Sequence, residues 1–153
     1  MWPDERVAQF VEENFVPVQV HVSRQAEEFQ KLGDRYGAHW TPMTLVLDSQ
    51  GVERHRTEGY LPVNDFLAQL ELGLAKVDFE KGRWTEAQRH FERVVDSFPK
   101  SDAAPEAVYW AGATRYKATH DASALSDAAR KLSSEFADST WTRKASVWMP
   151  PPS

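Results

Sequence analysis

The feature that most constrains this 153-residue chain is a stretch near residue 40 with the pattern of a β-hairpin entered through a proline. Thr41-Pro42 leads into Met43–Leu47, an almost entirely apolar run that suits a strand covered on both faces. Asp48-Ser49-Gln50-Gly51 then has turn composition, with glycine where a positive φ costs little. The following segment, Val52–Thr57, is so rich in charge that we expect an edge strand.

The flanking segments alternate between helical and strand patterns. Apolar residues recur at helical spacing between Glu5 and Asn14. Phe15–Val22 carries a valine at every second position, which predicts a strand, and Pro17 places that strand near an edge or gives it an irregular start. Helices are expected from Ser23, as N-cap, to Gly37, and from Val63 to Lys81.

This order of elements, with Thr41-Pro42 before an apolar strand and an Asp-x-x-Gly turn, resembles a thioredoxin from its first helix onward. The resemblance covers roughly Pro3 to Leu70. It implies an α/β fold and a cis peptide bond before Pro42. It also implies that the family's central first strand and its Cys-x-x-Cys motif would lie before residue 1. The chain has no cysteine, which excludes disulfides, thiol nucleophiles and thiolate metal ligands among its own residues.

A thioredoxin-like sheet without its first strand leaves the two neighbouring strands, 15–22 and 43–48, short of a ladder of backbone hydrogen bonds. Three outcomes are open. The two strands pair with each other, or a second copy or another protein supplies the strand, or the chain is the later part of a longer product. A helix that begins near residue 3 favours the last of these.

The second half of the chain has a purely helical periodicity. Phe98, Ser101, Ala107 and Trp110 recur 38 residues later as Phe136, Ser139, Ala145 and Trp148. Such repetition indicates stacked helix pairs. Phe98-Pro99-Lys100-Ser101 and Tyr109-Trp110-Ala111-Gly112 resemble the divergent tetratricopeptide repeats of bacterial envelope-associated proteins. The predicted organisation is a thioredoxin-like half lacking its first strand over 1–70, all-α tetratricopeptide-like helix pairs over 71–149, and a disordered tail over 150–153.

Composition excludes several function classes. The net charge of −5 lacks the basic excess of a nucleic-acid-binding face, so no nucleic-acid partner is expected. No apolar run approaches the roughly 20 residues of a membrane span, and no basic-then-apolar leader is present. The chain as given is therefore predicted to be cytoplasmic, or periplasmic or envelope-associated if its start is truncated. The five histidines have no metal-ligand spacing and no Gly-x-Ser-x-Gly motif occurs, so no catalytic residue, metal or cofactor is predicted.

Two groups of residues are candidates for peptide binding. Trp40, Thr41 and Pro42 form the proline loop, whose backbone would pair with an extended peptide; the competing interpretation is that the loop is only fold architecture. Trp110, Thr114 and Lys117 would line the concave face of the repeats, where Trp110 and Lys117 could hold an apolar anchor and a carboxylate. Packing between helix pairs is the competing explanation for Trp110.

The sequence therefore favours a non-catalytic, thioredoxin-like protein that acts as a protein- or peptide-interaction module. One alternative is a thiol–disulfide oxidoreductase of the thioredoxin family whose redox motif lies upstream of this chain. The other is a structural homodimer that completes its sheet by strand exchange.

Overall fold

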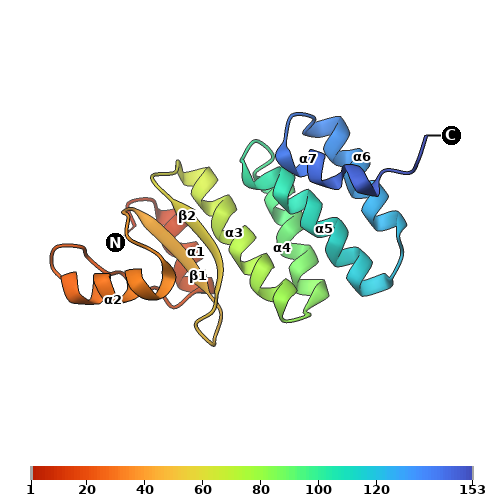
Figure 1. The fold of residues 1–153 in the computed structure, drawn as a ribbon. Coiled ribbons are helices and arrows are strands. Elements are labelled where there is room, and N and C mark those ends of the chain that lie inside the picture. The colour runs from red at the N-terminus through yellow and green to blue at the C-terminus, as the bar shows by residue number, and fades with distance from the viewer. Residues whose placement is uncertain (1, 153) are drawn as a thin grey trace. The chain divides into compact units, whose positions relative to one another are not determined.

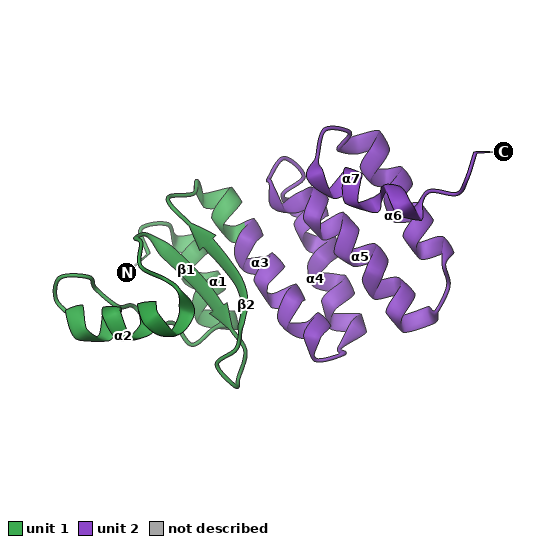
Figure 2. Ribbon diagram, viewed as in Figure 1, with its two compact units in different colours: residues 1–67 green, residues 68–153 purple. Residues whose placement is uncertain are grey.

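The computed structural model describes residues 2–152 and divides into two compact units, an N-terminal unit of residues 1–67 and a C-terminal unit of residues 68–153 (Figure 2). The elements, labelled in Figure 1, are α1 (Glu5–Asn14), α2 (Ala26–Tyr36), β1 (Met43–Leu47), β2 (Glu53–Glu58), α3 (Val63–Glu80), α4 (Trp84–Ser97), α5 (Ala103–Thr119), α6 (Ser123–Glu135), α7 (Thr140–Ala145) and a 3-10 turn, η1 (Ser146–Trp148). The α3 helix begins in the N-terminal unit and ends in the C-terminal unit, so the predicted boundary after residue 70 falls inside it.

The predicted hairpin is present. β1 and β2 pair in antiparallel fashion, with Met43 opposite Glu58 and a register irregularity after Val46. The turn is held by the Asp48 carboxylate, which accepts hydrogen bonds from the backbone N–H groups of Gln50 (2.9 Å) and Val52 (3.0 Å). Val46 is buried, whereas the next residue along β1, Leu47, is 39% exposed. The expectation that this strand is covered on both faces is therefore wrong at its end.

Side chains of the α2 helix tie it to the hairpin. The Tyr36 hydroxyl donates to the carbonyl of Gly51 at 2.8 Å. The Arg56 guanidinium on β2 donates to the carbonyl of Tyr36 and to the Glu53 carboxylate. The helix ends at Gly37 in the left-handed conformation, as expected, but its N-cap is Gln25 and not Ser23, so it begins at Ala26. The sequence pattern thus located the helix and missed its first residue.

The predicted strand over residues 15–22 is absent, and this segment has no regular structure. The sheet in the described residues contains β1 and β2 alone, so the two predicted neighbours of the family's first strand do not pair with each other. Val16 is 92% exposed and Val18 is 81% exposed. A segment with alternating apolar residues forms a strand only where a neighbouring strand supplies the partners for its backbone N–H and C=O groups. Nothing in the described residues supplies that ladder here.

The C-terminal unit is a run of helices joined by short turns (Figure 1). α4 packs against α5, α5 against α6, and α6 against α7, with α5 also contacting α7. Fully buried Leu72, Phe91 and Val94 anchor one apolar cluster, and Leu132 anchors a second with Val108. This arrangement is consistent with stacked helix pairs, while their assignment as tetratricopeptide repeats stays a prediction.

Among residues 2–152, no helix combines the length and the apolar content that a bilayer crossing requires.

Candidate functional site

The proline loop of the N-terminal unit lies open to solvent. The Thr41–Pro42 peptide bond is cis. The backbone N–H of Gly59 donates to the carbonyl of Pro42 at 2.8 Å, which brings the end of β2 beside the loop. Trp40 is 75% exposed, and Thr41 and Pro42 are exposed as well. All three loop residues predicted to bind a peptide are therefore accessible.

A second aromatic side chain, which the sequence analysis did not select, accompanies this loop. Tyr60 is 82% exposed and directly follows Gly59. The residue before it, Gly59, donates to the carbonyl of Pro42, so Tyr60 directly follows a residue that is bonded to the loop. The signal in the sequence was an aromatic residue in a Gly-Tyr-Leu-Pro turn, outside any apolar periodicity. We call Trp40, Thr41, Pro42 and Tyr60 the aromatic loop patch.

In the C-terminal unit, Trp110 packs within an aromatic cluster. Its ring lies 5.3 Å from the ring of Phe79 on α3 and 6.3 Å from that of Trp141 on α7, centroid to centroid. The neighbouring Tyr109 stacks on Trp148 at 4.4 Å. Trp110 is half-buried and its ring contacts residues of two other helices, α3 and α7, so these contacts are those of a packing residue.

The prediction that Thr114 lines a binding face is not compatible with its position. Thr114 is fully buried, and its hydroxyl donates to the carbonyl of Trp110 at 2.7 Å. A threonine inside a helix commonly returns its hydroxyl to the carbonyl four residues earlier, which removes it from the surface. Lys117 is exposed. The structure therefore does not assemble Trp110, Thr114 and Lys117 into one accessible surface.

A buried group of charged side chains joins α3 to α4. The Nδ1 atom of His90 contacts the Glu71 carboxylate, and its Nε2 atom lies 3.5 Å from Asp78. Arg93 approaches Glu71 from the surface at 3.5 Å, and Arg83 contacts Asp78 at 2.7 Å. Each ring nitrogen of His90 thus faces a carboxylate oxygen. His90 is buried, and α3 supplies the two carboxylates that its imidazole contacts.

A shallow groove of about 200 Å³ runs between α4, α5 and α6. Small and apolar residues form its floor, among them Val108, Gly112, Ala124 and Ala128. Charged and polar side chains stand along its rims: Gln88, Glu92, Asp96, Arg115, Asp127 and Lys131.

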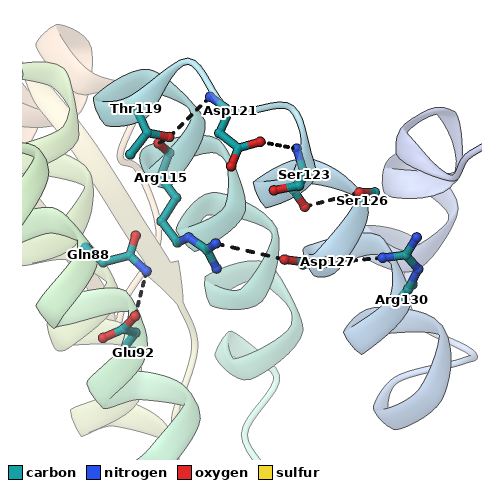
Figure 3. Close-up of polar contacts among 9 residues, drawn as sticks. All are labelled: Gln88, Glu92, Arg115, Thr119, Asp121, Ser123, Ser126, Asp127 and Arg130. Carbon is teal, nitrogen blue, oxygen red and sulfur yellow. Dashed lines mark hydrogen bonds and ion pairs between the residues drawn. The ribbon is translucent and has the colours of Figure 1, made fainter.

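Several rim side chains are already engaged with each other (Figure 3). The Gln88 amide donates to Glu92 at 2.6 Å, and Asp127 accepts from Arg130 at 3.2 Å and lies 3.9 Å from Arg115. Opposite charges therefore neutralise each other around α6. The groove therefore has the composition expected where helices pack together, with small apolar residues at the contact and charged side chains in solvent.

The carboxyl groups with a shifted pKa all move downward. The backbone and side-chain hydrogen bonds from Ser123 lower the pKa of Asp121, and the Arg56 guanidinium lowers the pKa of Glu53. The same contact with Glu53 raises the pKa of Arg56. These shifts stabilise the charged forms of capping and ion-paired groups. They do not create a carboxylic acid that stays protonated at neutral pH, which general acid catalysis would need.

The described residues, 2–152, contain no group of three or more His, Cys, Asp or Glu side chains arranged to hold a metal ion. The aromatic loop patch offers exposed aromatic rings for apolar contact and loop backbone groups for hydrogen bonding.

The comparison with known protein families agrees with the thioredoxin-like fold expected for the N-terminal part of the chain. Neither the curated proteins nor the solved structures include a significant match to this chain. Residues 1–74 match a family model described as a thioredoxin-like domain, which supports a thioredoxin-like domain in this part of the chain.

Proposed function

We propose that this protein is a non-catalytic protein-interaction module whose aromatic loop patch holds an extended peptide segment of a partner. The observation that carries this proposal is the exposure of two large aromatic side chains: Trp40, which precedes Thr41 and Pro42, and Tyr60, which follows the residue bonded to Pro42. Aromatic residues are the commonest anchors of protein interfaces because they bury a large area at a small entropic cost.

The backbone at the patch supports an extended ligand. The carbonyl of Pro42 already accepts from Gly59 on the β2 side. The preceding residue, Thr41, lies outside the paired strands and carries a backbone N–H and C=O of its own. Among the described residues neither group of Thr41 has a hydrogen-bond partner. An extended peptide can therefore pair with Thr41 while its side chains contact Trp40 and Tyr60.

The predicted repeat groove contributes less to this proposal. Thr114 is buried and Trp110 is packed against α3 and α7, which leaves Lys117 as the accessible member of that group. We retain the helix pairs as a tetratricopeptide-like scaffold and place the recognition chemistry in the N-terminal unit. The oxidoreductase alternative needs a thiol from residues upstream of this chain, because the chain itself contains no cysteine.

The test uses a random-peptide display library selected on the immobilised 153-residue protein. The selected peptide is then labelled, and its affinity is measured by fluorescence anisotropy for wild type, Trp40→Ala and Tyr60→Ala. Each substitution is expected to weaken binding by about tenfold or more, because each removes an anchor of the hot-spot class. Both side chains are mostly exposed, so thermal unfolding should change little.

Val147→Ala is the matched control, because Val147 is 82% exposed and lies in the C-terminal unit. It should leave the affinity unchanged. Failure to select any peptide, or a selected peptide that binds Trp40→Ala and Tyr60→Ala as tightly as wild type, would contradict the proposed site.

A further inference from the structure

The buried imidazole of His90, on α4, lies between two carboxylates of α3. Its Nδ1 atom contacts the Glu71 carboxylate, and its Nε2 atom lies 3.5 Å from the Asp78 carboxylate. Glu71 and Asp78 are about two helical turns apart, so they share one face of α3. All three residues belong to the C-terminal unit. A single ring therefore connects the two helices through both of its nitrogen atoms.

This arrangement matches one protonation state of the ring. A neutral imidazole has one N–H donor and one lone pair, whereas an imidazolium has an N–H on each nitrogen. Either neutral tautomer of His90 would turn a lone pair towards a carboxylate oxygen, on Glu71 or on Asp78. The imidazolium form directs a donor at each carboxylate instead. The geometry therefore favours a proton on both ring nitrogens.

Two influences oppose this second proton. Burial disfavours a charged ring, and Arg93 and Arg83 contact the same carboxylates, at 3.5 Å from Glu71 and 2.7 Å from Asp78. Both arginine side chains are about half exposed, so water and salt screen their charges. The two carboxylates contact the ring directly in a buried site, where charges interact more strongly. The direct contacts therefore outweigh the screened ones.

The remaining charged groups near α4 do not reverse this balance. Its other packing partner in this unit, α5, has its charged side chains engaged elsewhere or in solvent. Glu106 pairs with Lys76 at 2.8 Å, Arg115 lies 3.9 Å from Asp127 of α6, and Lys117 is exposed. On α4 itself, Glu86 lies one turn before His90, and its negative charge also favours a protonated ring.

We propose that His90 forms a pH-dependent link between α3 and α4, in which the imidazolium holds the two helices together and release of one ring proton to solvent weakens this contact. Loss of the proton leaves a lone pair facing a carboxylate. The folded chain thus retains a proton that the unfolded chain gives up. The link therefore stabilises the fold at mildly acidic pH, and its contribution disappears as the pH rises. It does not depend on the aromatic loop patch.

The protonation state is tested directly by a long-range ¹H–¹⁵N NMR spectrum of the histidine side chains in the 153-residue protein, which distinguishes imidazolium from either neutral tautomer. His90 is expected to carry a proton on both nitrogens at about pH 7, where an unperturbed imidazole is mostly neutral. A His90 ring with a single protonated nitrogen at this pH would overturn the proposal. This measurement needs no variant.

Urea unfolding between about pH 5.5 and pH 9, a range above the ordinary titration of carboxyl groups, tests the consequence. The folding constant of wild type relative to that of His90→Gln should fall at least about threefold as the pH rises, because wild type loses its extra proton. His120→Asn is the matched control. It removes an exposed imidazole at a left-handed position that asparagine tolerates, and its ratio to wild type should stay constant.

Asp78→Asn tests the role of the second carboxylate. The asparagine amide can donate to Nε2, so a neutral ring is accommodated and the folding constant should depend less on pH than that of wild type. A ratio of wild type to His90→Gln that does not change with pH would contradict the proposal. An equal change in His120→Asn, or wild-type pH dependence in Asp78→Asn, would contradict it as well.

Discussion

At the scale of single residues, His90 shows how two packed helices can bury a carboxylate. Its ring contacts Glu71, which is 1% exposed, and lies 3.5 Å from Asp78. These carboxylates sit on a different helix, so no local spacing in the sequence reveals the contact. Charged groups tolerate burial when each has a partner, and removing one partner leaves the other uncompensated.

His90→Ala is therefore expected to lower the free energy of unfolding by about 3 kcal/mol, because it leaves buried Glu71 without its main partner. Arg93→Ala removes the half-exposed second partner of the same carboxylate and should cost about 1 kcal/mol or less. Urea unfolding of the two variants beside wild type measures the difference. Equal and small losses would mean that Glu71 is hydrated.

Trp110 provides a second prediction at this scale. Its aromatic contacts with Phe79, Tyr109 and Trp141 indicate that Trp110→Ala will lower the free energy of unfolding by about 3 kcal/mol. Trp110→Phe retains a ring and should lose less than half as much. Thermal unfolding of both variants distinguishes a packing role of the Trp110 side chain from a role in peptide binding. A Trp110→Ala protein as stable as wild type, with impaired peptide binding, would restore Trp110 to the binding surface.

At the scale of elements, the crossing of α5 and α6 depends on one glycine. A Cβ atom added at Gly112 would lie 2.5 Å from the Cβ of Ala128 and 3.3 Å from the carbonyl oxygen of Ala124. Real Cβ atoms do not approach so closely, so the two helices would have to move apart. Overpacking of this kind typically costs about 1–3 kcal/mol.

Gly112→Ala should therefore destabilise the protein by about 2 kcal/mol, even though alanine is the better helix former. Adding Ala128→Gly removes the opposing methyl group and should recover part of the loss. The double-mutant cycle, measured by chemical denaturation, gives the coupling between the two positions. Strict additivity would show that the methyl groups do not meet.

The start of α6 supplies a prediction about pH. The carboxylate of Asp121 accepts from the backbone N–H of Ser123 at 2.9 Å, and this contact lowers its pKa from the usual value. A carboxyl with a lowered folded-state pKa stabilises the fold above its unfolded pKa, and the contribution disappears as pH falls through the folded value.

Asp121→Ala should thus be less stable than wild type at neutral pH, and the difference should shrink below about pH 4. Asp121→Asn retains an acceptor of similar capping strength and should stay near wild type at neutral pH. Thermal melts across this range provide the measurement. A gap between wild type and Asp121→Ala that stays constant down to strongly acidic pH would contradict a role for the ionised carboxylate.

Local patterns predicted those elements that are stabilised locally. The turn from Asp48 to Gly51, the left-handed end of α2 at Gly37 and the helical periodicity of α3 all depend on residues close in sequence. The segment 15–22 failed as a predicted strand because a strand needs a neighbour that sequence alternation cannot supply. Propensity for extended structure is realised only in the context of a sheet.

At the scale of the whole molecule, the candidate site was only partly predictable. Trp40, Thr41 and Pro42 could be selected because a proline before an apolar strand marks a turn that is exposed in a known fold. Tyr60 joins them because the residue before it, Gly59, donates to the carbonyl of Pro42, a contact between segments that are apart in the sequence. Thr114 was placed on the wrong side of its helix because a helical repeat register assigns faces by position, whereas packing decides which are buried.

The absence of cysteine leads to a prediction for the protein as a whole. Purified protein should not accelerate the reduction of insulin disulfides by dithiothreitol, since exchange requires a thiolate and the sequence has none. A dithiol thioredoxin assayed in parallel serves as the positive control. Turnover above the uncatalysed rate, in material shown by mass spectrometry to be this chain alone, would overturn the non-redox interpretation.

The α3 helix is shared by both compact units, which limits how the chain can be divided. Ala68, Leu72 and Ala75 belong to the apolar cluster of the C-terminal unit, although the helix that carries them starts at Val63. In a fragment that begins at residue 68, the first backbone N–H groups of the helix would lose the carbonyl oxygens to which they donate. A fragment stopping at residue 67 would keep a single unsupported helical turn. Recombinant halves intended for separate study should each retain this helix in full.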